Sequence, residues 1–415
     1  MYRKLHYNRL VNYVLLILAF YACYLIRTQL RLAGVTPWTA SENTKQTKPR
    51  DASIVQAIEK LVIESKDVCL EHVDVVPMCE PVRKVVFTKT HKTGSTTLAS
   101  IIERYGYTRN LSFVVPPDRK NGPHILSMNH LFHRNMAKKS APPLNGGEYY
   151  DMLTNHVRYN RPEMDAVLPN ATHITIIRHP AKHFESSFSY FLWGRDVKKE
   201  HGDVNVGDQI ATFMETPEKY IKNKIYFWWQ AHNGQLFDLG LSTDDTDNHT
   251  TVSKKIQALE KEMEFILIAD HFDESLLILK KKFCWTMDDI LYIPNGVRSK
   301  QFRREMSEET RARILDWNDS DLKLFEYFNK TLWQNIAEYG PCFERDLQYF
   351  REKRQKVMDE CIGPSQVVKK DPRETRYVLK ENASELCLNM WRGDVTFTKF
   401  IRNKQLSRIV HPLNN

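Results

Sequence analysis

The sequence predicts an α/β fold with a mainly parallel sheet, because one local pattern occurs three times along the chain. Each occurrence begins with a short apolar, β-branched run, at residues 85–88, 173–178 and 264–269. Each run is followed by residues with helical periodicity, at 96–104, 181–192 and 274–283. Runs that are apolar throughout are typical of strands buried on both faces, and their alternation with helices is typical of parallel sheets.

The composition is that of a folded globular protein, and its net charge suits an anionic partner. The chain has 415 residues, 42% of them hydrophobic and 27% charged, enough for one large domain or two ordinary ones. The 60 basic and 51 acidic residues give a net charge of +9, which suits an anionic nucleotide or an anionic membrane surface. No nucleic-acid-binding module is visible in the sequence, so nucleic acid is not an expected partner.

Residues 10–26 form an uncharged apolar segment between Arg9 and Arg27. We expect an uncleaved signal anchor with a cytosolic N-terminus, although the segment is at the short end for a membrane span. A cleaved signal peptide is the alternative, but no small-residue cleavage site follows the segment. A short span fits the thinner membranes of the early secretory pathway, which favours a type II protein of the Golgi membrane over one of the plasma membrane.

The rest of the chain divides by composition. We expect a cytosolic tail, the anchor, a stem and lead-in, a catalytic domain and a C-terminal helical or irregular extension, at residues 1–9, 10–26, 27–82, 83–350 and 351–415. Proline and glycine pairs within 112–162 indicate loops beside an acceptor cleft, and the polar residues 236–251 predict an exposed loop. Residues 343–360 predict a charged helix with a solvated face, whereas the pattern from 372 onward permits no assignment.

Glycosylation sequons and cysteines indicate which side of the membrane holds the domain. Six asparagines fit the N-x-[ST] pattern: Asn110, Asn170, Asn248, Asn318, Asn329 and Asn382. None precedes the apolar segment, as a lumenal C-terminal domain requires. Six cysteines follow that segment, an even number that suits disulfides in an oxidising compartment: Cys69, Cys79, Cys284, Cys342, Cys361 and Cys387. Fifteen pairings are open, and the shortest loop would join Cys69 to Cys79.

A phosphate-binding loop is the strongest single signal in the sequence. The apolar run 85–88 leads into K-T-H-K-T-G-S-T-T at 89–97, and a helical pattern follows. A glycine at position 94 lets backbone N–H groups approach an anion, and the start of a helix adds its dipole. The loop is not a Walker A motif, because Lys92 precedes Gly94 and no glycine lies five residues upstream.

The sequence of this loop resembles that of the galactose 3-O-sulfotransferase family. This family comprises carbohydrate sulfotransferases of the Golgi that use PAPS (3′-phosphoadenosine 5′-phosphosulfate). I-T-I-I-R-H-P at 174–180, with F-E-S-S-F-S-Y-F at 184–191, is similar to the family's 3′-phosphate motif. Residues 267–276, 284–285 and 328–333 are also similar to the family. The resemblance spans about residues 83 to 350 and implies a P-loop-like sulfotransferase fold, a central mainly parallel sheet flanked by helices and preceded by one transmembrane helix.

PAPS carries two phosphate groups at separate positions, so two anion sites are expected. At the first, the 5′-phosphate would be held by backbone N–H groups and hydroxyls of Thr93, Gly94, Ser95, Thr96 and Thr97. Lys92 would neutralise the charge that develops on the bridging oxygen. At the second, Arg178 and Ser186, eight residues apart, would hold the 3′-phosphate, with Ser187 as the adjacent alternative.

Transfer to a sugar hydroxyl needs a general base, and His91 is the candidate because it stands beside Lys92 in the loop. The family's K-T-H-K pattern supports this choice, and a structural role for His91 is the alternative. No metal is expected, since His124, His130 and His133 do not form a recognisable ligand set. Asn129, His130 and Arg158 are candidates for contact with the acceptor. The aromatic residues that follow the second motif could bind sugar or belong to the core: Phe188, Tyr190, Phe191 and Trp193.

The expected function is transfer of a sulfuryl group from PAPS to the 3-hydroxyl of a terminal β-galactosyl residue on a glycolipid or glycoprotein. The choice of galactose and of its 3-hydroxyl comes from the resemblance alone. Two alternatives stay open: a PAPS-dependent sulfotransferase for another carbohydrate such as a glycosaminoglycan, and a catalytically silent lumenal glycan-binding protein. The sequence also leaves a homo-oligomer open.

Overall fold

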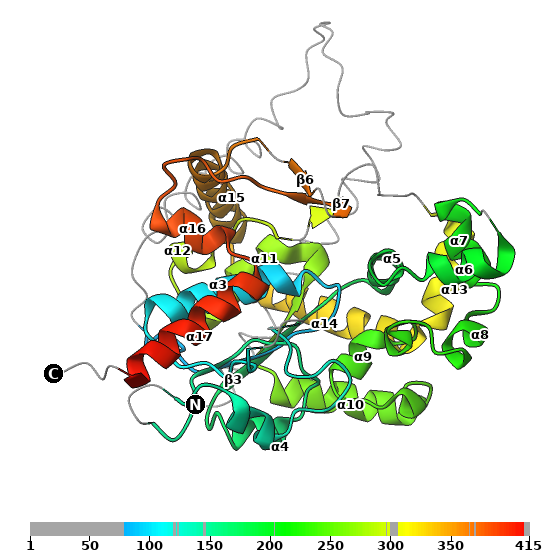
Figure 1. The fold of residues 1–415 in the computed structure, drawn as a ribbon, viewed down its shortest axis with the longest axis horizontal. Coiled ribbons are helices and arrows are strands. Elements are labelled where there is room, and N and C mark those ends of the chain that lie inside the picture. Colours follow the sequence, from blue (N-terminus) through cyan, green and yellow to red (C-terminus); the bar gives the residue numbers. More distant parts are fainter. Residues whose placement is uncertain are drawn as a thin grey trace, which may run out of the picture. The chain divides into compact units, whose positions relative to one another are not determined.

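Four parallel strands form the central sheet in the order β2-β1-β3-β4 (Figure 1). Their bounds are Val85–Thr88 for β1, Met152–Leu153 for β2, Thr172–Ile177 for β3 and Phe265–Ile268 for β4. The computed structural model describes residues 79–410, except 119–121, 123, 144–146, 203, 296, 299–305, 365 and 369–370. The three strands predicted from the sequence are confirmed and pair in parallel, with Phe87 opposite Ile174 and Ile174 opposite Phe265. β2 has only two residues and lies in the segment expected to form loops.

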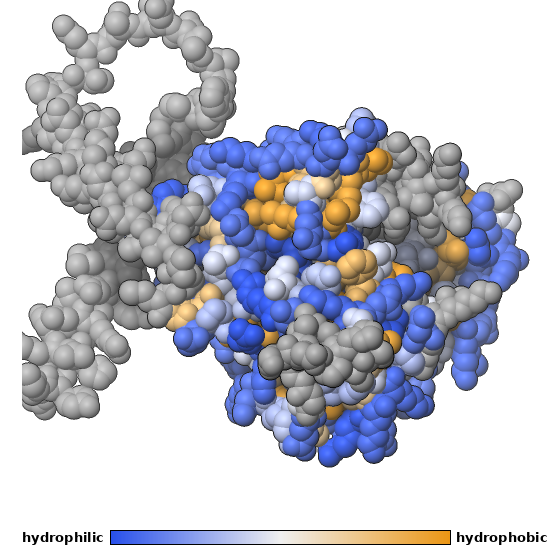
Figure 2. Space-filling model, turned by 60° about the vertical axis from the view of Figure 1, so that its left-hand side comes forward, coloured by the Kyte–Doolittle hydropathy of each residue, from blue (hydrophilic) through white to orange (hydrophobic). Residues whose placement is uncertain are grey.

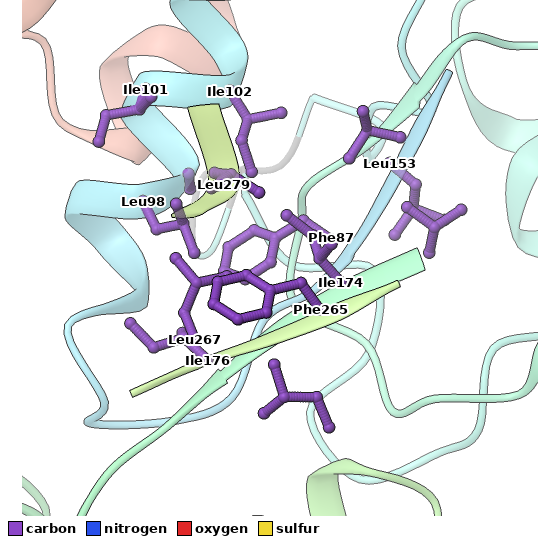
Figure 3. Close-up of a cluster of buried hydrophobic side chains, with 14 of the residues drawn as sticks. Phe87, Leu98, Ile101, Ile102, Leu153, Ile174, Ile176, Phe265, Leu267 and Leu279 are labelled. Carbon is purple, nitrogen blue, oxygen red and sulfur yellow. The ribbon is translucent and has the colours of Figure 1, made fainter. Parts of the chain in front are cut away.

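The sheet is buried because every strand contributes apolar side chains to one core. Figure 3 shows Phe87, Ile174 and Phe265 from the strands gathered with Leu98 and Ile102 from α3. All five are at most 4% exposed. Helix α3 (Ser95–Thr108) follows β1, α5 (Pro180–Tyr190) follows β3, and α11 (Phe272–Phe283) follows β4 after a short 3-10 turn, as the sequence predicted. The predicted α/β class with a parallel sheet is therefore confirmed.

The remaining helices surround this sheet and extend beyond it (Figure 1). They are α4 (Arg161–Asp165), α6 (Gly194–His201), α7 (Val206–Phe213), α8 (Pro217–Lys222), α9 (Gly234–Asp238), α10 (His249–Glu262), α12 (Met287–Ile290), α13 (Glu308–Trp317), α14 (Asp319–Tyr339), α15 (Phe343–Cys361), α16 (Glu385–Trp391) and α17 (Asp394–Val410). A small antiparallel sheet has the order β5-β7-β6, with β5 at Val297–Arg298, β6 at Gln366–Val368 and β7 at Asp371–Arg376. The charged helix predicted over 343–360 is confirmed as α15.

A second hydrophobic cluster contains most of the aromatic candidates, together with residues of α5. Phe188, Phe191 and Trp193 are at most 4% exposed and belong to this cluster, together with Phe213 of α7. Only Tyr190 of the four aromatic residues is on the surface, at 52% exposed. The core interpretation therefore fits these three rings, whose helical spacing reflects packing, and Phe191 also lines an open cavity.

The segment 236–251 was expected to be an exposed loop. Most residues of 242–250 are exposed, but the prediction is wrong for 236–241. Part of the segment belongs to α9 and to the start of α10, and Leu236 and Leu239 are fully buried. The backbone N–H groups of Gln235 and Leu236 donate to the buried carboxyl group of Asp321 on α14 at 3.0 and 2.9 Å. These tertiary contacts, which the polar sequence does not reveal, hold the start of the segment inside the fold.

The disulfides also differ from the shortest-loop prediction. Cys79 pairs with Cys284, and Cys361 pairs with Cys387. The proposed bond between Cys69 and Cys79 is therefore wrong. The reason lies in the fold, because the chain before β1 runs beside the end of α11, where the N–H of Val82 donates to the carbonyl of Phe283 at 2.9 Å. Spatial proximity set by the sheet outweighs the small entropic advantage of a short loop.

The face of the described residues that Figure 2 shows is largely hydrophilic, with smaller apolar areas. Within 79–410, apart from the gaps given above, no helix combines the length and the apolar character needed to span a bilayer. The expected anchor at 10–26, the tail before it and most of the stem lie outside the described residues. Cys69 also lies outside them.

Candidate active site

The loop between β1 and α3 has the backbone shape of an anion cradle. Lys92 and Gly94 both adopt the left-handed conformation, with φ of 53° and 80°, and Gly94 caps α3. A side chain added at Gly94 would meet no atom within 4 Å, so the backbone angle, rather than crowding, requires glycine there. The first helical N–H groups that bond to Gly94 are those of Thr97 and Leu98. The N–H groups of Ser95 and Thr96 have no partner within the helix and lie at its N-terminus, the positive end of the helix dipole.

Three hydroxyl groups of the loop have hydrogen-bond partners within the protein, and their predicted contact with a phosphate stays a prediction. Those of Thr93 and Ser95 donate to the carbonyl of Thr90, and that of Thr97 accepts from the N–H of Asn295 at 3.1 Å. These three side chains therefore fix the loop from inside. The backbone N–H groups remain the donors that the loop presents to a ligand.

Lys92 and Arg178 bring positive charge to the same loop. The ammonium group of Lys92 lies 3.6 Å from the centre of the Tyr190 ring, a cation–π contact on the exposed side of α5. Arg178 follows β3 directly, and its guanidinium donates to the carbonyl of Lys92 at 3.2 Å. Its own backbone is clamped by the side chain of Gln235, through bonds of 2.7 and 2.9 Å. The two predicted motifs, 86 residues apart in sequence, thus meet at the carboxyl ends of neighbouring strands.

The two serines that were alternatives at the second motif differ in burial. Ser187 is fully buried and its hydroxyl has no hydrogen-bond partner in the structure, whereas Ser186 is partly exposed on the same helix. Ser186 is therefore the one that a ligand in solution can reach. Its predicted role beside Arg178 stays a prediction.

A buried carboxylate holds the imidazole of His91. Nδ1 of His91 lies 2.9 and 3.0 Å from the two oxygens of Asp238, and the backbone N–H of His91 donates to the same carboxylate at 2.7 Å. A carboxylate accepts hydrogen bonds, so the contact assigns the proton to Nδ1 and leaves Nε2 with its lone pair. Nε2 lies on the other side of the ring, 3.4 Å from the sulfur of Met128. This arrangement is suited to accepting a proton at Nε2.

The surroundings of the His91–Asp238 pair fix its geometry. The amide of Gln230 donates to Asp238 at 2.8 Å, and Nε2 of His183 lies 3.1 Å from the carbonyl of His91. Burial lowers the pKa of His183 to about 3, so this neighbour is neutral at physiological pH. The ring of His156 stacks on His91 at 4.5 Å between centroids. Sequence reasoning missed Asp238, because it lies in the segment that was expected to be an exposed loop.

A buried polar network lies next to this pair. Lys89 forms an ion pair with Asp394 at the start of α17, and both side chains are at most 13% exposed. Glu103 of α3 accepts a hydrogen bond from Thr154 at 3.0 Å. Burial, reinforced by the charge of Asp394, raises the pKa of Glu103 to about 8. Asp394 was also missed, because no pattern was recognisable beyond residue 372.

One group of side chains in the described part of the chain has the spacing of metal ligands. Atoms of His124, His156 and Asp394 all lie within 4.8 Å of one another. Lys89 already neutralises Asp394, and a divalent cation beside that ammonium would be repelled. His130 and His133 are not part of the group: His130 contacts Ser127 at 3.2 Å, and His133 accepts from the N–H of Asn135.

The three acceptor candidates occupy different environments. Arg158 is 9% exposed, and its guanidinium donates to the carbonyls of Phe237, Leu241 and Asn129 at 2.7, 2.7 and 3.1 Å. Its contacts therefore favour a structural role that ties the α9 region to the Asn129 loop. Asn129 and His130 are exposed on that loop, and their contact with an acceptor stays a prediction.

The sequons also differ in accessibility. Asn110, Asn170, Asn248 and Asn382 are exposed, and Asn329 is partly buried on α14. Asn318 is only 3% exposed; its side chain accepts from the N–H of Asn233 at 2.8 Å and donates to the carbonyl of Ile314 at 2.9 Å. A glycan at Asn318 is incompatible with these contacts, so the expectation for this residue is corrected.

A parallel α/β sheet with two cationic motifs at its carboxyl edge and a carboxylate-held histidine between them is suited to group transfer from a phosphorylated donor. Comparison with known proteins agrees, because residues 2–378 match the sequence pattern of the galactose-3-O-sulfotransferases. The chain belongs to the galactose-3-O-sulfotransferase family of enzymes.

Three relatives illustrate the degree of similarity. The chain is 32% identical over 292 residues to the galactosylceramide sulfotransferase of Bos taurus. The matched region covers 70% of this chain and 66% of that protein, which is just under two thirds of its length. It is 31% identical over 307 residues to the galactose-3-O-sulfotransferase 3 of Mus musculus, covering 70% and 68%. It is 30% identical over 307 residues to the galactose-3-O-sulfotransferase 2 of Homo sapiens, covering 72% and 74%.

Proposed function

We propose that this protein transfers a sulfuryl group from PAPS to the 3-hydroxyl of a terminal β-galactosyl residue on a glycolipid or glycoprotein glycan. The observation that carries the proposal is the His91–Asp238 pair, in which Asp238 of α9 holds a histidine of the phosphate loop. Phosphate binding alone would be compatible with a kinase or a silent binder. A histidine whose Nδ1 faces a carboxylate adds the group needed to remove a proton from a sugar hydroxyl.

The residues of the loop fit an anionic donor. Gly94 leaves open space at the start of α3, and helix N–H groups, Lys92 and Arg178 supply the donors and positive charge. Lys92 and the loop N–H groups are proposed to hold the 5′-phosphosulfate, and Arg178 with Ser186 the 3′-phosphate. When bound, PAPS would supply the sulfuryl group and leave as PAP. No metal is needed in this scheme, because cationic side chains balance the developing charge.

The role of His91 is to accept the proton of the attacking hydroxyl at Nε2. The galactose oxygen forms its bond to sulfur while the bond from sulfur to the bridging phosphate oxygen breaks. Asp238 stabilises the imidazolium that results, and Lys92 balances the charge on the leaving oxygen. Asp238 acts through His91 and is a positioning residue.

Galactose as the acceptor sugar is supported by the names of the relatives, each of which is a galactose or galactosylceramide sulfotransferase. The proposed location is the Golgi membrane, with a type II anchor at 10–26, a stem to about residue 82 and a lumenal catalytic domain. Sequons and disulfides support that side of the membrane.

The test is transfer of radiolabelled sulfate from PAPS to a panel of galactosides. The panel contains galactosylceramide, lactosylceramide, N-acetyllactosamine and Galβ1-3GalNAc, each paired with a version blocked at the galactose 3-hydroxyl. We expect label on at least one free galactoside and none on its blocked partner. Equal labelling of free and blocked acceptors would refute the 3-position. A glycosaminoglycan without galactose is assayed beside the panel, and labelling of it alone would refute galactose.

A further inference from the structure

An open cavity of about 670 Å³ lies between α6, α8 and the chain that follows α8. Its lining includes Phe191, Arg195, Lys224 and Tyr226. The volume is within the range of about 300–1,000 Å³ that is typical of small-molecule sites. Nothing in the proposed transfer mechanism uses this cavity.

The cavity adjoins the candidate base through a wall of aromatic rings. Phe191 lines the cavity, and its ring centre is 6.2 Å from that of His91. Phe227 stacks on Phe191 at 4.4 Å, and its ring centre lies 5.8 Å from that of His91. Tyr190, beside Phe191 in sequence, lies under the ammonium group of Lys92. The ring of Phe191 is therefore next to both His91 and the cavity.

The backbone around the cavity is held in an unusual shape. Leu192, Lys224 and Phe227 adopt the left-handed conformation with φ of 62°, 49° and 58°, although none is glycine. Leu192 and Lys224 directly follow the C-caps of α5 and α8, where the left-handed conformation ends a helix, and Phe227 precedes a short 3-10 turn. Here the indole of Trp193 donates to the carbonyl of Tyr226 at 2.6 Å and joins the two walls. The cavity is therefore built into the fold.

The chemistry of the lining selects a polar ligand. Acidic and basic side chains alternate on α6, where Asp196 pairs with Lys199 at 2.9 Å. Among the residues that the structure describes, Arg195 and Lys224 form no ion pair, so their donors are available. The ring of Tyr226 is 68% exposed and offers an apolar face beside them. Sugar hydroxyls pair with charged donors and acceptors, and the C–H face of a sugar packs on an aromatic ring. An alkyl chain would desolvate the same charges without compensation.

We propose that this cavity binds the sugar that follows the terminal galactose of the acceptor, and that the protein thus favours galactose within an oligosaccharide over galactose without a second sugar. This inference rests on the proposed function. Tyr226 would stack on the second sugar, and Arg195 and Lys224 would donate to its hydroxyls.

The experiment compares kcat/KM of the full chain, in detergent, for N-acetyllactosamine and for methyl β-galactoside. We expect the wild type to prefer the disaccharide. Tyr226→Ala should reduce that preference by about five- to tenfold, and Tyr226→Phe, which keeps the ring, should preserve it. Arg195→Ala, at an exposed side chain without an ion pair among the described residues, should reduce the preference in the same direction.

The control is Tyr327→Ala, at an exposed tyrosine on α14 outside the cavity, which should leave the preference unchanged. Equal loss of activity on both acceptors in Tyr226→Ala and Arg195→Ala would overturn the inference, as would an unchanged preference. If the wild type sulfated neither galactoside nor any other in the panel, the proposed function itself would have failed. The two failures are therefore distinguishable.

Discussion

Replacing Asp238 with asparagine tests how the protein prepares His91. The carboxylate accepts three donors: the backbone N–H of His91 at 2.7 Å, its Nδ1 at 2.9 Å, and the amide of Gln230 at 2.8 Å. Asparagine has nearly the same shape but carries one NH2 group in place of an acceptor oxygen. Whichever way the amide is turned, its NH2 group faces either the His91 N–H or the Gln230 amide.

The expected effect on catalysis follows from the tautomer. An amide NH2 beside Nδ1 favours a lone pair there and places the ring proton on Nε2, so the imidazole can no longer accept a proton from the acceptor. The contribution of a general base is about 10²–10⁴-fold, and we expect kcat to fall by at least about 10²-fold, or about 2.7 kcal/mol. The unpaired buried donor should also lower the free energy of unfolding by about 1–3 kcal/mol.

The assay measures kcat at saturating PAPS and galactoside, together with PAP binding by calorimetry and unfolding by urea. PAP affinity should stay close to that of the wild type, because Asp238 contacts no residue of the loop beyond His91 among the bonds described. Asp316→Asn, at an exposed carboxylate on α13, is the matched control and should change none of the three. A folded Asp238→Asn protein with kcat within about threefold of the wild type would refute the reasoning.

Three further predictions concern the anion site, a buried acid and a disulfide. Arg178→Ala should weaken PAP binding by about 10- to 100-fold, as expected for loss of a charge-assisted bond to phosphate, and an unchanged calorimetric Kd would exclude Arg178 from the 3′-phosphate site. Glu103 has its pKa raised from 4.5 to about 8, so the folded state retains a proton that the unfolded state loses, and stability falls as the pH rises from about 4.5 to 8. Glu103→Gln should remove part of that fall, at most about 5 kcal/mol, and identical pH dependence of urea unfolding in both proteins would contradict this assignment. Replacing both Cys361 and Cys387, which are separated by 26 residues, with serine should lower the free energy of unfolding by about 3.5 kcal/mol; a loss below about 1 kcal/mol in urea titrations would show that the bond adds little.

The fold was predictable where one local pattern carried the information. Three apolar runs became β1, β3 and β4, because strands buried on both faces need apolar residues throughout. β2 was not predictable, because a strand of two residues is too short to show a periodic pattern of apolar residues. α16 and α17 were missed for a related reason: the apolar pattern beyond residue 372 is weak, and α17 packs on α3 through contacts that only the tertiary structure defines.

The site was predictable in part for the same reason. The loop at 89–97 and Arg178 are marked by glycine and by charged residues at strand ends, and the structure brings them together. Asp238 lies in a segment that was predicted to be an exposed loop, and Asp394 lies in one for which the sequence permitted no assignment. Their role depends on tertiary contacts with His91 and Lys89, which no local sequence pattern encodes.

The central claim is that His91 acts as the base beside a separate anion site, and His91→Ala tests it most directly. PAP binding and sulfate transfer to a reactive galactoside would be measured on the same preparation. The account predicts PAP affinity within about threefold of the wild type and a loss of at least about 10²-fold in kcat. Retained turnover would contradict the account, and so would a loss of PAP binding that matched the loss of turnover.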